Sequence, residues 1–140
     1  MVKKPDWLFP QSAVIPYLKT NDTIEIVLIT SSSKNGWTIP KGTIERFLSP
    51  EESAAKEALE EAGVTGKVIS TLVSKYEYKK WGGTCNVRVY PMEVLEIRET
   101  WEEQSERERV IVKISEAITL VKPILTPVIE KFFKHIAYYN

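Results

Sequence analysis

The stretch 49–63 carries the strongest local signals in the chain, and these signals predict a helix. Ser49 can cap free backbone amides, and Pro50 suits the first helical position. Gly63 is typical of a helix end. The alanines between these limits favour helix and permit close packing against a neighbouring layer. We therefore expect a capped helix that packs one face against the rest of the fold.

Three glutamates near the end of this helix need an explanation of their own. Glu57, Glu60 and Glu61 are spaced by three and four residues, which places their carboxylates on one helix face. Like charges at this spacing repel one another, and clustered carboxylate oxygens are the ligands that hard divalent cations prefer. Most glutamate-rich helix faces are simply solvated, so the cluster alone is consistent with an exposed acidic surface or with a metal site.

The wider spacing resembles the Nudix box. That pattern is a glycine, five residues, a glutamate, seven residues, and then Arg-Glu-apolar-any-Glu-Glu-any-Gly-apolar, and it runs here from Gly42 through KEALEEAGV at 56–64. The resemblance implies an α/β fold, the Nudix-type α/β/α sandwich with a mixed β-sheet. It also implies Mg²⁺, or Mn²⁺, held by Glu57, Glu60, Glu61 and the main-chain carbonyl of Gly42.

Two positions depart from this pattern. Leu48 stands where the box has its first glutamate, and Lys56 stands where it has arginine. Lysine is a point charge on a flexible stem and reproduces the planar fork of arginine imperfectly. Glu45 lies close to the missing glutamate in sequence. We expect metal binding to survive these changes. Catalytic efficiency should depend on how well Lys56 replaces the arginine that, by the resemblance, orients a metal-binding glutamate.

The motif Trp37-x-x-Pro40-Lys41-Gly42 leads directly into this region. Proline fixes the backbone, and glycine lets the main chain approach a ligand closely. The motif is similar to the one in Nudix enzymes that act on diadenosine polyphosphates and diphosphoinositol polyphosphates. This similarity implies that Lys41 contacts phosphate.

The segments on either side of the helix read as strands. Residues 12–18 form an expected strand that Pro16 places at an edge or a bulge, and residues 23–30 are rich in β-branched side chains, which is typical of a buried strand. Residues 67–80 and 84–97 predict two long strands joined into a hairpin by a glycine turn. The hairpin should carry a basic tip and place two tyrosines on one face: Lys79, Lys80, Tyr76 and Tyr78.

The last part of the chain changes character at residue 98. Residues 98–109 are too highly charged for a core, so we expect a surface loop anchored by Trp101. A short strand over 110–114 and a brief helix should follow. A terminal helix should start at Pro123 or Thr126, with four apolar residues repeating along its buried face: Ile124, Val128, Phe132 and Ile136.

Composition narrows the class of protein. The 140 residues suit one domain, 1–140, and the 19 basic and 19 acidic residues cancel, which gives no overall field toward nucleic acid or membrane. Cys85, the single cysteine, excludes an internal disulfide and reads as a small strand residue. The extended N-terminal arm up to Pro10 lacks the apolar core of a signal peptide, so we expect a cytoplasmic protein, monomeric or homodimeric.

Hydrolysis of a phosphoanhydride needs a base and cations for the phosphates. The resemblance leaves the base open between Glu57 or Glu61 on the helix and two glutamates of the charged loop, Glu102 and Glu103. For the loop pair, exposure to solvent without a role is the simpler interpretation. The candidates for binding a polyanionic substrate are basic residues from three segments: Lys41, Lys79, Lys80, Arg107 and Arg109.

The resemblance therefore indicates a magnesium-dependent pyrophosphohydrolase that takes a small-molecule phosphoanhydride, of the diadenosine polyphosphate or diphosphoinositol polyphosphate type. One alternative is a hydrolase that removes modified nucleoside triphosphates. Another is a nucleotide-binding module in which Leu48 and Lys56 mark a weakened site. The intact set of Glu57, Glu60 and Glu61 argues against the second alternative, because carboxylates that hold no cation repel one another.

Overall fold

The computed structural model describes residues 8–139, so residues 1–7 of the expected N-terminal arm, like Asn140, lie outside the described residues. A mixed sheet of eight strands forms the centre of the fold. Its strands are β1 (Leu8–Thr20), β2 (Thr23–Thr30), β3 (Trp37–Thr38), β4 (Lys41–Thr43), β5 (Val64–Val68), β6 (Ser74–Lys80), β7 (Gly83–Ile97) and β8 (Arg109–Lys113). The helices are α1 (Pro50–Glu57), η1 (Ala58–Ala62), α2 (Ile114–Leu120), η2 (Pro123–Leu125) and α3 (Thr126–Tyr139).

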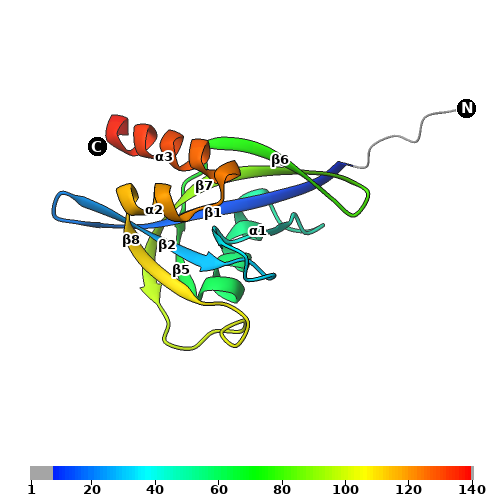
Figure 1. Cartoon of the computed structure of the whole chain (residues 1–140), viewed down its shortest axis with the longest axis horizontal. Coiled ribbons are helices and arrows are strands. Elements are labelled where there is room, and N and C mark those ends of the chain that lie inside the picture. The colour runs from blue at the N-terminus through cyan, green and yellow to red at the C-terminus, as the bar shows by residue number, and fades with distance from the viewer. Residues whose placement is uncertain (1–7, 140) are drawn as a thin grey trace, which may run out of the picture.

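The sheet is covered on both faces, with α1 on one side and α2 and α3 on the other (Figure 1). Alternate residues of β1 supply the two cores, because successive side chains of a strand point to opposite faces. Val14 packs with Ala54 and Ala58 of the acidic helix, whereas Ile15 packs with Phe132 of α3. This arrangement confirms the expected α/β/α sandwich with a mixed sheet.

β1 lies inside the sheet, parallel to β7 and antiparallel first to β4 and then to β2. Of the two alternatives expected for Pro16, an edge or a bulge, the edge was therefore wrong. The register with β4 ends at Ala13 and the register with β2 begins at Tyr17, so Pro16 falls in the gap between them. In that gap no antiparallel partner requires the N–H that proline lacks.

The long strand expected over 67–80 is two strands, β5 and β6. Both pair antiparallel with β7, and residues 69–73 form a break between them. The glycine turn between β6 and β7 lies where the sequence predicts. As expected, Tyr76 and Tyr78 lie on one face of β6, with ring centroids 6.3 Å apart.

The acidic helix begins and ends where the sequence predicts. Ser49 Oγ accepts a hydrogen bond from Glu52 N at 3.0 Å, while Glu52 Oε1 accepts one from Ser49 N at 2.9 Å. Gly63 closes the helix in the left-handed conformation, with φ 66°. Its last turn, Ala58–Ala62, is a π-helix, which residue propensities do not distinguish from an α-helix. Single π turns inside helices are frequent at functional sites.

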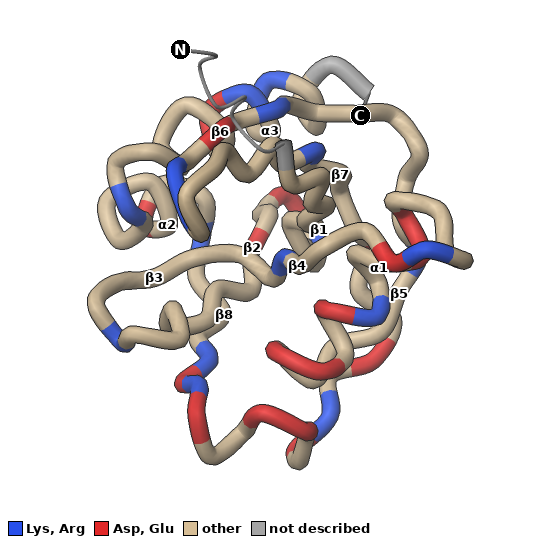
Figure 2. Tube along the Cα trace, turned by 90° about the vertical axis from the view of Figure 1, so that its right-hand side faces the viewer, with Lys and Arg blue, Asp and Glu red and all other residues tan. Residues whose placement is uncertain are grey.

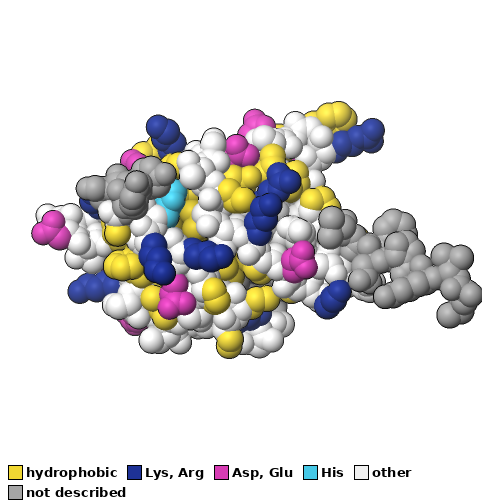
Figure 3. All heavy atoms as spheres, turned by 90° about the horizontal axis from the view of Figure 1, so that it is seen from above, with side chains coloured by type: hydrophobic (Ala, Val, Ile, Leu, Met, Phe, Trp, Pro, Cys, Tyr) yellow, Lys and Arg dark blue, Asp and Glu magenta, His cyan; other side chains and the backbone are white. Residues whose placement is uncertain are grey.

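The C-terminal segment follows the expected order with one correction. α3 starts at Thr126, and Val128, Phe132 and Ile136 are buried as predicted. Ile124 belongs instead to the short η2 helix and is 43% exposed. The face of the molecule seen in Figure 3 carries side chains of both charges interspersed with hydrophobic ones. No helix within residues 8–139 is both long and apolar enough to cross a membrane.

Candidate active site

A cavity of about 520 Å³ is bounded by β4, β6, the end of the acidic helix and the segments that follow β2 and α2. This volume falls in the range usual for small-molecule sites. Carboxylates, cations, hydroxyls and aromatic rings line the cavity together: Gln11, Ser31, Ser32, Ser33, Thr38, Ile39, Lys41, Gly42, Thr43, Glu57, Glu61, Tyr76, Tyr78, Lys80, Trp81, Arg107, Lys122, Ile124 and Leu125.

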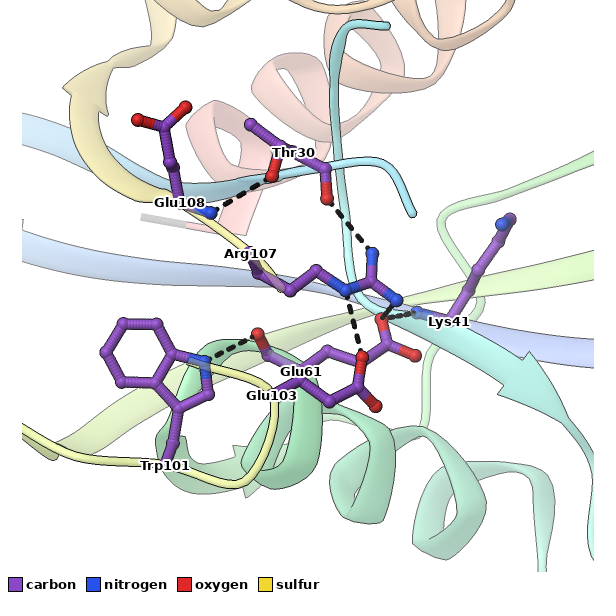
Figure 4. Close-up of polar contacts among 7 residues, drawn as sticks. All are labelled: Thr30, Lys41, Glu61, Trp101, Glu103, Arg107 and Glu108. Atoms are coloured by element: carbon purple, nitrogen blue, oxygen red, sulfur yellow. Dashed lines mark hydrogen bonds and ion pairs between the residues drawn. The ribbon is translucent and has the colours of Figure 1, made fainter. Parts of the chain in front are cut away.

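Glu61 is the most buried carboxylate of the cavity, with 6% of the residue exposed. Its Oε1 accepts a hydrogen bond from the backbone N–H of Lys41 at 3.3 Å and lies 3.7 Å from Nη2 of Arg107 (Figure 4). Burial, followed by the hydrogen bond with Glu57, raises the pKa of Glu61 to about 9. Without a cation, this carboxyl group therefore keeps its proton at neutral pH.

Glu57 lies against Gly42, and the contact leaves no room for a side chain there. A Cβ atom added to Gly42 would meet Glu57 Cδ at 2.4 Å. Burial also raises the pKa of Glu57, although its hydrogen bond with Glu61 acts in the opposite direction. The two carboxyl groups thus form a pair that shares a proton in a confined space.

Glu60 lies outside the cavity lining, next to two glutamates of the loop 98–108. Carboxylate oxygens of Glu60, Glu102 and Glu103 lie within 4.8 Å of one another, a separation that one metal ion could span. The backbone N–H of Glu103 donates to Glu60 O at 3.0 Å, which fixes the loop to the helix. Figure 2 shows acidic positions of the helix and of this loop on the same side of the molecule.

Arg107 connects these two acidic groups. Its Nε donates to Glu103 Oε1 at 3.0 Å and its Nη1 donates to the carbonyl of Thr30 at 3.0 Å, while Nη2 faces Glu61. The Arg107 side chain is only 12% exposed. Its planar fork therefore holds the loop, the end of β2 and the buried carboxylate in one geometry.

Trp101 anchors the loop 98–108, as the sequence predicts. Its Nε1 donates to the carbonyl of Glu61 at 2.9 Å. Arg109 stacks on the indole ring at 4.1 Å and donates through Nη1 to the carbonyls of Ala62 and Arg98, each at 2.8 Å. The guanidinium of Arg109 is thus used to hold the loop, and Arg109 does not line the cavity where a substrate-binding residue was expected.

The basic candidates on β6 separate by strand alternation. Lys80 lines the cavity with Tyr76 and Tyr78, since residues two apart share a face. Lys79 points to the other face, where its Nζ donates to Thr84 Oγ1 at 2.7 Å. The pair at the hairpin tip therefore supplies one cation to the cavity, not two.

The profile of the NUDIX domain matches residues 9–135. The chain belongs to the NUDIX family. Nudix hydrolase 17, mitochondrial, of Arabidopsis thaliana is 38% identical over 101 residues, which cover 71% of this chain and 55% of that protein. Diphosphoinositol polyphosphate phosphohydrolase 2 of Rattus norvegicus is 30% identical over 129 residues, which cover 88% of this chain and 70% of that protein.

The Ap4A hydrolase of C. elegans, in a binary complex, has the same fold. Its TM-score is 0.77 at 20% identity, covering 92% of this chain and 98% of that chain. The present chain spans little more than half the length of the plant Nudix relatives it matches. The cytoplasmic location stays a prediction, because the names of several relatives place them in mitochondria or a chloroplast.

Of the two departures from the Nudix box, Lys56 lies in an ion-pair cluster. Lys56 Nζ lies 3.0 Å from Glu45 Oε1 and 3.1 Å from Glu60 Oε1. The hydrogen bonds with Glu45 and then Glu60 raise the pKa of Lys56. Lys56 thus links the loop before the helix to a glutamate of the Nudix cluster, and Leu48 takes no part in these contacts.

The Nudix carboxylates fit a hard divalent cation. The donors are carboxylate and carbonyl oxygens, which Mg²⁺ and Mn²⁺ prefer. Burial sets two of these carboxylates side by side with raised pKa values, so both can ionise only when a cation compensates them. Gly42, whose Cβ would fill the space taken by Glu57, keeps the main chain close to the same oxygens.

Sequence reasoning missed Lys122 and the connecting role of Arg107. Lys122 lines the cavity from the segment between α2 and η2, far in sequence from the Nudix box. The sequence around Lys122 gives little indication of a site, since a lysine before a proline is common on protein surfaces. Arg107 was named as a substrate contact, but its contact with the Thr30 carbonyl exists only in the folded sheet.

Proposed function

We propose that this chain is a divalent-metal-dependent pyrophosphohydrolase, working with Mg²⁺ or Mn²⁺, that cleaves a phosphoanhydride bond in a small polyphosphorylated molecule. One observation carries the proposal. The same cavity holds the carboxyl pair Glu57 and Glu61 and the cations Lys41, Lys80 and Arg107. A metal-bound phosphate chain satisfies both kinds of group, and family membership supports the reaction class.

The chain's own residues divide the work. Glu57, Glu61 and the carbonyl of Gly42 would hold a metal ion at the cavity, and Glu60 with the loop glutamates would hold another. A metal ion held by these residues would supply neutralisation of phosphate charge and a lower pKa for a bound water molecule. Lys41 and Arg107 would bind the phosphates. The confined cavity would hold the phosphates in line with the attacking water molecule.

The general base is one of four glutamates, and the geometry favours Glu103 over Glu102 within the loop. Arg107 fixes the Glu103 carboxylate, and the Glu103 backbone is bonded to the helix at Glu60. Glu102 is exposed. A positioned base is more effective than a mobile one, because proton transfer depends on geometry first. Glu57 and Glu61 remain the candidates on the helix.

The substrate class that we propose is a diadenosine polyphosphate or a diphosphoinositol polyphosphate. The relative from rat, named a diphosphoinositol polyphosphate phosphohydrolase, covers most of this chain and supports the second of these. The basic residues of the cavity support both, because each further phosphate gains a cation.

A substrate panel tests the proposal. Phosphate or nucleotide release is measured on diadenosine tetraphosphate, a diphosphoinositol phosphate and several nucleoside triphosphates, with Mg²⁺ present or chelated. Glu130→Gln is the control variant for Glu61→Gln, since Glu130 is exposed on α3 and does not line the cavity. Turnover that persists when Mg²⁺ is chelated would overturn the proposal. So would the absence of turnover on every phosphoanhydride of the panel.

A further inference from the structure

One buried hydroxyl group takes no part in the hydrogen bonds of the fold. Within residues 8–139, Ser12 Oγ is the one buried side-chain nitrogen or oxygen without a hydrogen-bond partner, and none of the Ser12 surface is exposed. Ser53, a second buried serine, differs: its Oγ accepts from the backbone N–H of Glu45 at 2.9 Å. An unpaired buried hydroxyl destabilises a fold, so the hydroxyl of Ser12 needs an explanation.

The position of Ser12 in the sheet determines where its hydroxyl faces. On β1 it lies between two paired strands, opposite Gly42 of β4 and Arg88 of β7, so the backbone groups around it serve strand pairing. Residues two apart in a strand share a face, and Val14 packs in the core beneath the acidic helix. Ser12 therefore faces the layer that contains α1, not the layer of α3 (Figure 1).

Gly42 relates this hydroxyl to Glu57. Directly opposite residues of an antiparallel pair point to the same face, with Cβ atoms about 5 Å apart. The Cβ position of Gly42 lies 2.4 Å from Glu57 Cδ and 2.5 Å from Glu57 Oε1. The Glu57 carboxyl group thus occupies the space beside Ser12 that a side chain at position 42 would fill. Its hydrogen bond goes to Glu61 instead, which leaves the hydroxyl of Ser12 unpaired.

A carboxylate that binds a cation is usually held in orientation by hydrogen bonds to its remaining lone pairs. Ser12 offers an unused donor on the face where Glu57 lies. We propose that Ser12 is a positioning residue for Glu57, and that its hydroxyl donates to the Glu57 carboxylate when this carboxylate binds a divalent cation. The inference rests on the proposed function, because it takes Glu57 as a metal ligand. Ser12 itself touches neither the ion nor the substrate.

This role predicts opposite effects of a single substitution, Ser12→Ala. Without metal, the variant loses an unpaired buried hydroxyl, so its unfolding temperature should rise by roughly 2–6 °C. With metal, it loses the donor to Glu57, so Mn²⁺ binding should weaken roughly tenfold, as is usual when the partner of a metal ligand is removed. For the same reason kcat should fall with little change in KM. A serine with only a structural role would not change Mn²⁺ affinity.

Both effects can be measured on the whole chain without turnover. Calorimetry with Mn²⁺ alone gives the affinity, and thermal unfolding with a chelator gives the stability. Ser74→Ala is the matched control, because Ser74 is buried on β6, pairs with Val89 and faces the layer of α3. The Ser74 hydroxyl already donates to the carbonyl of Lys75 at 3.4 Å. Its removal should neither raise the unfolding temperature nor weaken Mn²⁺ binding.

A double-mutant cycle tests the route through Glu57. In the Glu57→Gln background, Ser12→Ala should weaken Mn²⁺ binding by less than about twofold further, because the group that Ser12 positions is already changed. A tenfold loss that persists in this background would place the partner of the hydroxyl elsewhere and overturn the inference.

Two other results would also overturn it. One is an unchanged Mn²⁺ affinity in Ser12→Ala. The other is a lower unfolding temperature of Ser12→Ala without metal, which would show that the hydroxyl already has a partner such as a buried water molecule. Both leave metal-dependent hydrolysis intact. The absence of Mn²⁺ binding by the unsubstituted chain would instead remove the proposed function itself.

Discussion

The two charged walls of the cavity are built in different ways. The acidic pair, Glu57 and Glu61, comes from one helical segment, four residues apart. The basic groups Lys41, Lys80 and Lys122 come from segments separated by about forty residues each and meet only through the sheet. The acidic wall is therefore a local property of the sequence, and the basic wall is a property of the whole fold.

This difference suggests a division of roles. A local cluster with fixed spacing keeps its geometry when loops change, which suits the bond-breaking step. A wall assembled from distant segments can vary one residue at a time, which suits the choice of substrate. Substitutions in the acidic wall should therefore lower turnover on every substrate, and those in the basic wall should change preference.

The largest effect is expected for Glu61→Gln. The substitution keeps the shape but removes the charge of a proposed metal ligand, so kcat/KM should fall about 10³-fold on all substrates. Folding should be unchanged or slightly more stable, because glutamine is already neutral and does not have to take up a proton when it is buried, as Glu61 must at neutral pH. Steady-state kinetics measure kcat/KM and thermal unfolding measures stability, with Glu130→Gln as the control variant. Near-normal turnover would end the metal assignment at this residue.

A second test displaces Glu57 without changing its charge. Gly42→Ala places a methyl group where Glu57 Cδ lies 2.4 Å away, so the carboxylate must move. A misplacement of this size should cost about 100-fold in kcat. Gly82→Ala is the contrasting variant, since nothing lies within 4 Å of its Cβ but its φ is 72°. It should lower stability by about 1 kcal/mol and leave kcat within about twofold. Equal kcat in both variants would refute the contact.

In the basic wall, neighbouring lysines should differ. Lys80→Gln removes a cation that lines the cavity, and kcat/KM for long polyphosphates should fall about fivefold, with less effect at high salt. Lys79→Gln should change it by less than about twofold, because Lys79 faces Thr84 on the opposite side of β6. The two variants are compared on diadenosine tetraphosphate and on a nucleoside triphosphate. Proportional losses on both substrates would contradict a role in preference.

The raised pKa of Glu61 predicts how pH affects the metal-free protein. Between its ordinary value of 4.5 and the folded value of about 9, the folded chain binds more protons than the unfolded chain. The free energy of unfolding should therefore decrease as pH rises through this window. Denaturant unfolding at pH 5, 7 and 8.5 with a chelator measures the decrease, which should be smaller in Glu61→Gln. Identical pH profiles would mean that Glu61 is ionised without metal.

The same contrast explains how far the sequence could predict the molecule. The caps at Ser49 and Gly63 and the spacing of the glutamates follow local rules, and the structure places the helix at those limits. The interior position of Pro16 depends on where the pairing of β1 with β4 ends and its pairing with β2 begins. Local sequence rules do not predict that point. Lys122 is held by Trp37 and Arg107 by Thr30, and both of these partners lie far away in the chain.

The smallest effect is expected for Lys56, which lines neither wall of the cavity. Its side chain is 45% exposed and joins Glu45 to Glu60, so it acts through position, not by touching substrate. Arginine can hold both carboxylates with its planar fork. We therefore expect Lys56→Arg to raise kcat/KM or leave it within about twofold, since exposed ion pairs contribute little.

Lys56→Gln is the matched variant, because it removes the bridge and keeps a polar side chain. It should lower kcat/KM by about two- to threefold with little change in KM, because Lys56 positions Glu60 through an exposed ion pair. A KM effect alone would place Lys56 in substrate binding. A large loss in Lys56→Arg would show that the loop at Glu45 has been rebuilt around the smaller ammonium group. The acidic wall would then depend on a contact outside its own helix, and it would resemble the basic wall more than its spacing suggests.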